Sequence, residues 1–343
     1  MTKPEEKVVK QEFDVHTIEK IPTIEDYKAP KYPIVLCHGL SGFDKLILIP
    51  SVFKLTRLLT SSIHLNNSDH FLEGGDQDSE IREKNLLEID YWIGVKEILE
   101  KNGCQTITTK VPGFGSIEER ALALAASIER EVAKLQEKTP PPRNIFGFRT
   151  KTKVNLLAHS MGGLDCRYLI AKMPKRNYEV ASLTTISTPH RGSEMADYVV
   201  NLFLDLKPTN IESSNIWLPT CFYQLTTSYM AYFNQLIRND PKVKYFSYGS
   251  YFEPKWYNVL AWPWKVIAKA TNGDLNDGLV TIKSSQWGKY EGTLKNVDHL
   301  DIINWKNKLQ DDLFKRFPKI GYETVNVLDF YLQVTDNLAR NGL

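Results

Sequence analysis

The segment Lys153–Arg167, KVNLLAHSMGGLDCR, constrains the fold more than any other part of this 343-residue chain. Its apolar start predicts a buried strand, and residues 164–173 have the spacing of a helix. Between the two, Ser160 has the small residues Ala158 and Gly162 two positions before and after it. Small residues there allow a sharp strand–turn–helix bend that presents a serine at the carboxyl edge of a sheet. An ordinary glycine-rich turn would give the same five residues, so the interpretation needs partners elsewhere in the chain.

Predicted strands and helices alternate along the chain, which is typical of an α/β protein with a doubly wound, mostly parallel sheet. The apolar runs that predict strands are residues 32–37, 104–111, 154–158, 180–187 and 243–249. We expect a polar N-terminal arm over 1–31 and one α/β domain over 32–343. Within that domain, a polar and acidic stretch indicates an insertion at 47–86, and 194–240 carries apolar and aromatic residues at helical spacing.

Composition limits the partners and the cellular compartment that we expect for this chain. The net charge is only +2, so no global field attracts nucleic acid, and we expect no nucleic-acid partner. No apolar run approaches the roughly 20 residues that span a bilayer. The start, MTKPEEKVVKQEFD, mixes acids and bases and resembles neither a signal peptide nor a transit peptide. The four cysteines are dispersed, and most lie in apolar runs, which predicts buried thiols in an intracellular, reducing compartment.

A catalytic serine needs a histidine base, and the histidine needs an orienting carboxylate. On an open α/β sheet these residues follow one another in the order serine, acid, histidine. Only His190 and His299 come after Ser160 in the sequence, and no acid between Ser160 and His190 is well placed. We therefore assign Ser160 as the nucleophile, Asp277 as the orienting acid and His299 as the base.

Other acids compete with Asp277 for the role of orienting His299. Asp274 is the serious alternative, since it lies in the same loop. Asp298 and Asp301 are so near His299 in sequence that their side chains would have difficulty reaching the back of its ring. A helix-capping or core role for His299 itself is the structural alternative to catalysis.

The tetrahedral intermediate of acyl transfer also needs backbone N–H donors. One donor is expected from Met161, directly after the serine, and the other from the loop that follows the first strong strand. In that loop we choose Leu40, and we assign His38 the role of holding the loop in place. The Leu, Phe and Trp side chains around these segments suggest a long apolar acyl chain as ligand.

Six blocks extend the pattern well beyond the serine motif. They are YPIVLCHGLSGFDK at 32–45, YWIGV at 91–95, VPGFGS at 111–116, VNLLAHSMGGLDCRY at 154–168, TTISTPHRGSEMAD at 184–197, and the run from NDGLVTIKSS to VDHLD at 276–301. Together they resemble the true lipases of the α/β-hydrolase superfamily that are related to the Pseudomonas and Burkholderia triacylglycerol lipases. Within that group the chain most resembles the fungal mitochondrial triacylglycerol lipases.

The resemblance implies an α/β-hydrolase fold with a helical lid at 194–240, and a serine esterase that cleaves triacylglycerols and diacylglycerols. It carries the same catalytic roles to Ser160, Asp277 and His299, and so favours Asp277 over its rival. It also carries the oxyanion donors to Leu40 and Met161. A mitochondrial location is implied by the resemblance alone.

Two departures from the bacterial relatives concern a metal ion and a disulfide. The relatives bind a structural calcium beside the catalytic histidine, and Asp301 matches one of its ligands, but Trp305 stands where a ligating glutamine is expected. We therefore expect no metal or other cofactor and a helix-capping role for Asp301. Lys283 occupies one position of the disulfide of the secreted relatives, which suits an intracellular protein.

Contact with a lipid droplet or membrane surface is expected from the segment Trp256–Trp264, where indoles lie beside lysines, as in interfacial anchors. Packing in the core is the alternative for these indoles and for the apolar stripe of 194–240. Two other functions stay open at this point. One is a different acyl specificity, such as a phospholipase A1, a diacylglycerol lipase or an acyltransferase, and the other is a non-catalytic lipid-binding protein.

Overall fold

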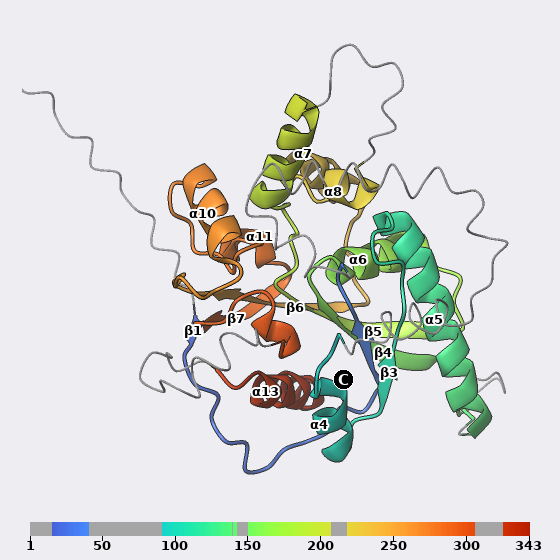
Figure 1. Cartoon of the computed structure of the whole chain (residues 1–343). Helices are drawn as coiled ribbons and strands as arrows, with labels where there is room; N and C mark the ends of the chain where they lie inside the picture. Colours follow the sequence, from blue (N-terminus) through green and yellow to red (C-terminus); the bar gives the residue numbers. More distant parts are fainter. Residues whose placement is uncertain (1–15, 41–90, 139, 143–149, 207–217, 306–324) are drawn as a thin grey trace, which may run out of the picture.

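The computed structural model describes residues 16–40, 91–138, 140–142, 150–206, 218–305 and 325–343. Within them, seven strands form one sheet in the order β1-β7-β6-β5-β4-β2-β3, and every neighbouring pair is parallel (Figure 1). The strands are β1 (Thr17–Ile18), β2 (Ile34–Cys37), β3 (Thr106–Thr108), β4 (Thr152–His159), β5 (Tyr178–Ile186), β6 (Lys244–Tyr251) and β7 (Lys289–Lys295). The prediction of a doubly wound, mostly parallel sheet is therefore confirmed.

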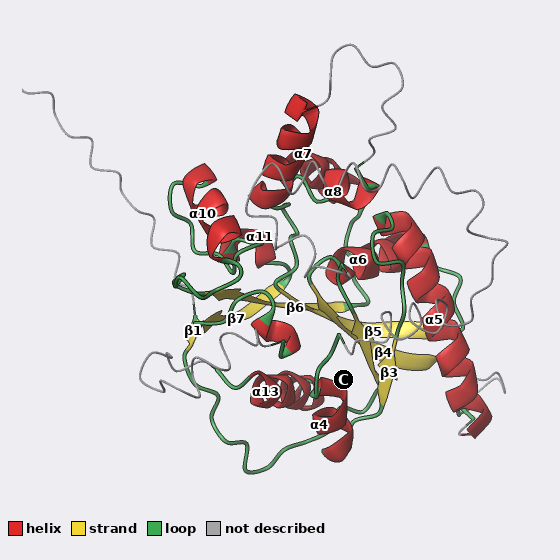
Figure 2. Ribbon diagram, viewed as in Figure 1, coloured by secondary structure: helices red, strands yellow, loops and turns green. Residues whose placement is uncertain are grey.

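Helices connect the strands and lie on both sides of the sheet (Figure 2). They are α4 (Val95–Lys101), α5 (Ile117–Lys138), α6 (Gly162–Lys172), α7 (Glu194–Leu206), α8 (Thr220–Gln224), α9 (Thr227–Leu236), α10 (Ala261–Ala270), α11 (Ile282–Ser285) and α13 (Val327–Arg340), with a 3₁₀ turn η1 at Asp301–Ile303. The predicted insertion at 47–86 lies outside the described residues. No described helix combines the length and the apolar character needed to cross a membrane.

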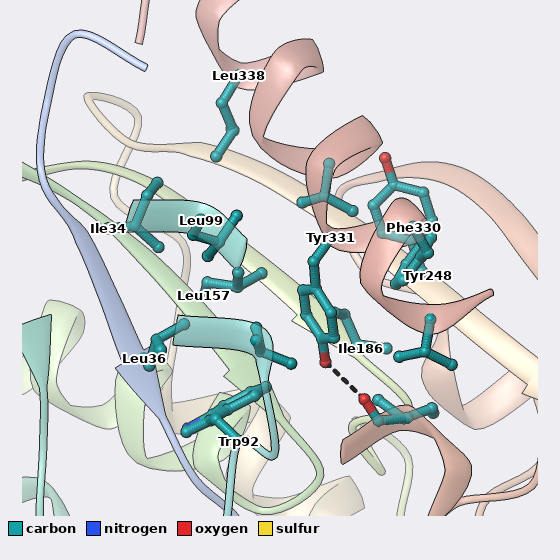
Figure 3. Close-up of a cluster of buried hydrophobic side chains, with 14 of the residues drawn as sticks. Ile34, Leu36, Trp92, Leu99, Leu157, Ile186, Tyr248, Phe330, Tyr331 and Leu338 are labelled. Carbon is teal, nitrogen blue, oxygen red and sulfur yellow. Dashed lines mark hydrogen bonds between the residues drawn. The ribbon is translucent and has the colours of Figure 1, made fainter. Parts of the chain in front are cut away.

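Two hydrophobic layers enclose the sheet because side chains alternate along each strand. In β2, Ile34 and Leu36 pack against α4 and α13, whereas Val35 and Cys37 pack against α5 and α6. Figure 3 shows the first layer, in which Leu99 of α4 and Tyr331 of α13 meet residues of the sheet. The carboxyl ends of β2, β4 and β5 are therefore fixed from both faces.

Backbone turns limit two of the helical elements near the site. α4 begins only at Val95, after Gly94 turns the chain with a φ of 73°. After His299 the chain forms only the short turn η1.

The described part of the N-terminal arm, residues 16–31, lies against the body of the protein. Thr17 and Ile18 pair with β7 at one edge of the sheet. The Tyr27 hydroxyl lies 2.9 Å from both the Thr335 hydroxyl and the Cys104 sulfur. Residues 16–31 therefore lie on the surface of the protein. Their strand β1 covers the edge of β7, whose backbone groups would otherwise lack a neighbouring strand.

Candidate active site

The turn at Ser160 joins β4 to α6 and holds the serine in an unusual backbone conformation. Ser160 has a φ of 56°, which is costly for a residue with a side chain. Its amide donates to the carbonyl of Ile186, at 3.0 Å, and the Thr188 hydroxyl donates to its carbonyl, at 2.7 Å. A Cβ on Gly162 would lie 2.6 Å from the Cys37 carbonyl oxygen, so only glycine fits there. This is the strained, closely packed bend that the sequence predicted.

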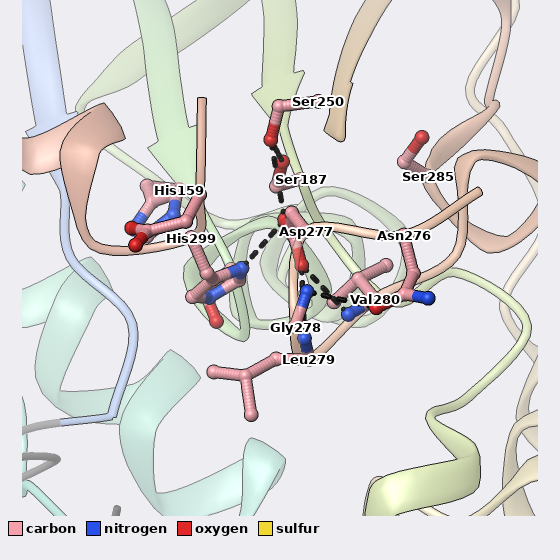
Figure 4. Close-up of polar contacts among 12 residues, drawn as sticks. His159, Ser187, Ser250, Asn276, Asp277, Gly278, Leu279, Val280, Ser285 and His299 are labelled. Carbon is pink, nitrogen blue, oxygen red and sulfur yellow. Dashed lines mark hydrogen bonds and ion pairs between the residues drawn. The ribbon is translucent and has the colours of Figure 1, made fainter. Parts of the chain in front are cut away.

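Asp277 and His299 lie together at the same edge of the sheet. The Nδ1 of His299 lies 2.8 Å from Oδ2 of Asp277, and both side chains are almost fully buried (Figure 4). The other Asp277 oxygen accepts the amides of Leu279 and Val280, at 3.0 and 2.8 Å. Ser250 donates to Oδ2, at 3.4 Å. These contacts hold the carboxylate behind the imidazole ring.

The rival acids have other surroundings. Asp274 is exposed at the surface. Asp298 accepts the amides of Leu300 and Asp301, each at 2.9 Å, while Oδ2 of Asp301 accepts the Asp298 amide, at 3.0 Å. Both are therefore used within their own turn, and among these acids the structure brings Asp277 to the histidine.

The two expected oxyanion donors lie beside the serine. Leu40 and Ser160 line the same cavity. Met161 is the residue that caps α6, and the first amides of a helix have no partner within it. Both side chains are buried, in one cluster with residues of α6, α7, α8 and α9. Several residues of the apolar stripe of 194–240 pack in this cluster.

Arg120 of α5 fixes the loop that carries Leu40, and sequence reasoning missed it. Its guanidinium is fully buried and donates to the carbonyls of His38 and Gly39, at 2.9 and 3.1 Å, and to that of Pro112, at 2.7 Å. It also pairs with Asp165 of α6, at 2.8 Å. Burial raises the pKa of Asp165 to about 6, although Arg120 acts in the opposite direction.

His38 links the same loop to the segment after β3. Its Nε2 accepts the amide of Val111, at 3.2 Å, and its Nδ1 lies 2.8 Å from the Gly39 carbonyl. Burial lowers the pKa of His38 to about 4, and the positive charge of Arg120 adds to this, so the ring is neutral. A neutral ring with one donor and one acceptor fits both contacts.

The cavity in front of Ser160 is apolar apart from two serines. It is lined by Leu40, Ser160, Pro189, Ser193, Met195, Ala196, Val199, Phe222, Leu225, Trp262, Pro263, Leu279 and Val280. Leu279 and Val280 belong to the Asp277 turn, so the proposed acid lies directly behind the cavity wall. Such a slot suits a hydrocarbon chain.

The acidic residues next to His299 make backbone contacts within their own turn. The oxygens of Asp298 and Asp301 that face their turn already accept backbone amides, and Trp305 offers no oxygen ligand from its side chain. Over the described ranges, no three His, Cys, Asp or Glu side chains are grouped so that they could hold a metal ion. A hard cation needs several oxygens at once.

Two further residues next to the serine were not assigned from the sequence. His159, directly before Ser160, is 1% exposed, and its ring centroid lies 4.5 Å from that of His299. The Tyr91 hydroxyl lies 2.7 Å from Nδ1 of His159. Tyr91 stands in one of the blocks that carry the family resemblance, and that was the available signal.

Known proteins share both the sequence and the fold. Residues 33–260 match the family model described as "Palmitoyl protein thioesterase". The chain is 58% identical to "Triacylglycerol lipase 2" of Saccharomyces cerevisiae over 95% of its length and 96% of the relative. It is 30% identical to "Triacylglycerol lipase" of Burkholderia plantarii over 56% of this chain and 38% of that one. Among solved structures, Staphylococcus hyicus lipase superimposes with a TM-score of 0.55 at 18% identity, covering 93% of this chain and 98% of that one.

Proposed function

The chain belongs to the triacylglycerol lipases of the α/β-hydrolase fold, and from this premise we propose that it hydrolyses long-chain triacylglycerols and diacylglycerols through an acyl-enzyme on Ser160. The observation that carries the proposal is the buried Asp277–His299 pair beside a strained serine that opens on an apolar cavity. The resemblance to the lipase family is confirmed by the relatives. The comparisons do not favour the alternative functions, a phospholipase or acyltransferase and a non-catalytic lipid-binding protein.

In the proposed mechanism, Ser160 Oγ attacks the carbonyl carbon of the ester while Nε2 of His299 takes the hydroxyl proton. Asp277 accepts the hydrogen bond of Nδ1–H, keeps the ring in the correct tautomer and stabilises the imidazolium. The amides of Leu40 and Met161 donate to the oxyanion. Collapse of the intermediate breaks the ester C–O bond, and His299 returns the proton to the leaving alcohol. A water molecule, deprotonated by His299, then cleaves the acyl-enzyme to release the fatty acid.

This chemistry uses only side chains and amides of the chain, so we propose that it needs no cofactor. The apolar cavity holds the acyl chain of the substrate, with its wall formed by α7, α8 and the start of α10. Burying each methylene of such a chain is worth about 0.8 kcal/mol, which favours long acyl groups.

The proposal is tested by Ser160→Ala, assayed on emulsified triolein. We expect the variant to lose hydrolysis by several orders of magnitude while keeping its unfolding temperature. Ser127→Ala, which removes a buried hydroxyl from α5, is the matched control and keeps full activity. Full activity in a folded Ser160→Ala would show that the triad is assigned wrongly.

Substrate class is tested by offering the wild-type protein triolein, diolein and phosphatidylethanolamine side by side. We expect the two acylglycerols to be cleaved faster than the phospholipid. Faster cleavage of the phospholipid would instead indicate a phospholipase that uses the same catalytic triad.

We further propose that the cavity mouth faces a lipid droplet or membrane surface. Trp256 is 76% exposed, and Trp262, which lines the cavity, packs its ring 5.6 Å from that of Tyr198 on α7. Exposed lysines at 255, 265 and 269 flank these rings. Indoles and lysines together are suited to the interface of a lipid layer.

This surface is tested by Trp256→Ala, measured on emulsified triolein and on a soluble short-chain ester. We expect a lower rate on the emulsion alone, because the soluble ester needs no surface. Leu122→Ala is the control, since Leu122 is 61% exposed on α5. The proposal would be contradicted if Trp256→Ala lowered the rate equally on the emulsion and on the soluble ester. It would also be contradicted if Leu122→Ala lowered the rate on the emulsion as much as Trp256→Ala.

We also propose an intracellular, mitochondrial location. It rests on the resemblance to the fungal mitochondrial lipases, and the four buried free thiols are consistent with a reducing compartment. Cell fractionation with antibodies against the native protein tests it, and recovery in another fraction would overturn it.

A further inference from the structure

His159 and Tyr91 lie against the proposed machinery without a part in the steps above. The ring of His159 packs on the ring of His299, with centroids 4.5 Å apart and planes inclined by 43°. The Tyr91 hydroxyl lies 2.7 Å from Nδ1 of His159. The rings of Tyr91 and Trp92 also contact His159, at 5.8 and 6.4 Å. Tyr91 therefore supports His159, whose ring packs on the proposed general base, His299.

The same hydroxyl also lies against the oxyanion loop. A Cβ placed on Gly39 would come within 2.8 Å of the Tyr91 hydroxyl and within 2.7 Å of Ser160 Cβ. Gly39 therefore lies between the serine and the tyrosine, one residue before Leu40. The ring of Tyr91 also contacts the ring of His38, at 5.3 Å. Tyr91 therefore touches both the loop and His159.

Burial keeps both partners of the Tyr91–His159 hydrogen bond uncharged. Burial raises the pKa of Tyr91 above its usual value, so the hydroxyl keeps its proton. Burial lowers the pKa of His159 well below its usual value, and the charge of His299 adds to this. A neutral imidazole has one acceptor nitrogen. The Tyr91 hydroxyl and Nδ1 of His159 therefore meet as two uncharged groups, 2.7 Å apart, and this contact fixes the orientation of the His159 ring.

We propose that Tyr91 is a positioning residue that acts through His159: its hydroxyl fixes the orientation of a neutral ring, which sets the His299 ring against Ser160. The groups that face His299 are then the carboxylates of Asp277 and Asp298 and this neutral ring. A neutral neighbour lets His299 take up the serine proton without facing a second positive charge. This inference rests on the proposed function of Ser160 and His299.

The first test is Tyr91→Phe, which removes the hydroxyl and keeps the ring. On a soluble short-chain ester we expect kcat to fall about tenfold, with KM changed by less than about twofold, because a transition-state arrangement is lost and not a substrate contact. Tyr27→Phe is the matched control, because it removes a part-buried hydroxyl that bonds Cys104 and Thr335. We expect Tyr27→Phe to keep the wild-type kcat even if its unfolding temperature falls by as much as that of Tyr91→Phe.

The second test asks whether Tyr91 acts through His159. His159→Asn retains a short side-chain acceptor near the tyrosine and removes the part of the ring that meets His299. We expect its kcat to fall to a similar degree, and the double variant to be no slower than the slower single one. A folded His159→Asn with wild-type kcat overturns the inference, even if Tyr91→Phe does not fold.

Ser160→Ala is assayed in the same series to separate the two proposals. If Ser160→Ala retains activity, the proposed function fails. If it is inactive while a folded Tyr91→Phe has the wild-type kcat, only the role of Tyr91 fails. Losses that multiply in the double variant likewise exclude action through His159.

Discussion

Arg120 offers the sharpest test of how the oxyanion loop is held. Its guanidinium donates five hydrogen bonds, to the Asp165 carboxylate and to the carbonyls of residues 38, 39, 112 and 113. In Arg120→Lys the charge remains, but an ammonium has only three donors and no planar fork. At least two of the five contacts are lost, so we expect the free energy of unfolding to fall by about 3 kcal/mol.

The expected effect of Arg120→Lys on kcat depends on which contacts to the oxyanion loop are lost. Removing a whole oxyanion donor costs about 10²–10³ in kcat. Arg120→Lys loosens the loop and leaves the Leu40 amide in the chain, so we expect a loss between about 10-fold and 100-fold. Arg120→Met also leaves the Asp165 carboxylate buried without a cation, which costs about 3–5 kcal/mol in stability.

The assay compares kcat on a soluble ester with the free energy of unfolding from urea titration. Arg176→Lys is the control, because Arg176 is a half-buried arginine whose guanidinium donates to the Leu169 carbonyl, at 2.9 Å, away from the loop. We expect that variant to keep kcat. If a folded Arg120→Lys keeps kcat within about twofold of the wild type, the loop is positioned by other contacts and the reasoning is wrong.

Three further predictions concern the site and its support. Asp277→Asn leaves the His299 ring in place but favours the wrong tautomer, so kcat on a soluble ester falls by about 10⁴ at an unchanged unfolding temperature. Gly162→Ala drives a Cβ against the Cys37 carbonyl, and urea titration gives an unfolding free energy lower by about 1–3 kcal/mol. Because burial raises the pKa of Asp165 from 3.8 to about 6, the folded state binds its proton more tightly than the unfolded state. Relative to Asp165→Asn, the wild type therefore loses about 2 kcal/mol of stability as pH rises from 4 to 6, and a flat difference over that range would exclude the shift.

The parts of the fold that were predictable carry local signals. The runs that became β2, β4, β5 and β6 each contain a cluster of apolar residues, as expected for strands buried on both faces. The start of α5 is another example. Ser116 and Glu119 exchange hydrogen bonds at 2.8 and 3.2 Å, which is the reciprocal cap that their spacing predicts.

The elements that were missed depend on pairing partners. β7, KYEGTLK, has little apolar character, and the two residues of β1 form no pattern at all. β7 is held by β6 on one side and by β1 on the other. No window of sequence contains that information, because the pairing joins Thr17 to Thr293.

The candidate site divides in the same way. Ser160 was predictable because a sharp bend requires small neighbours within five residues, and Asp277 and His299 because chain order restricts the choice. Within its own loop, however, the acid stayed ambiguous until the family resemblance was used. The structure separates the two aspartates by orientation, since a turn exposes one and buries the other against Leu279 and Val280.

The supporting residues were unpredictable for a different reason. Arg120 reaches the carbonyls of a loop more than 80 positions away, and Tyr91 reaches a histidine 68 positions away. Such contacts are made to backbone atoms or to a single ring nitrogen, so they impose no periodicity on the sequence. They become visible only once β2 and β4 are neighbours in the sheet, because that pairing puts the oxyanion loop, the serine turn and the segment before α4 side by side. The types of the catalytic residues can therefore be predicted from the chemistry of acyl transfer. The residues that orient them are determined by the order of the strands in the sheet.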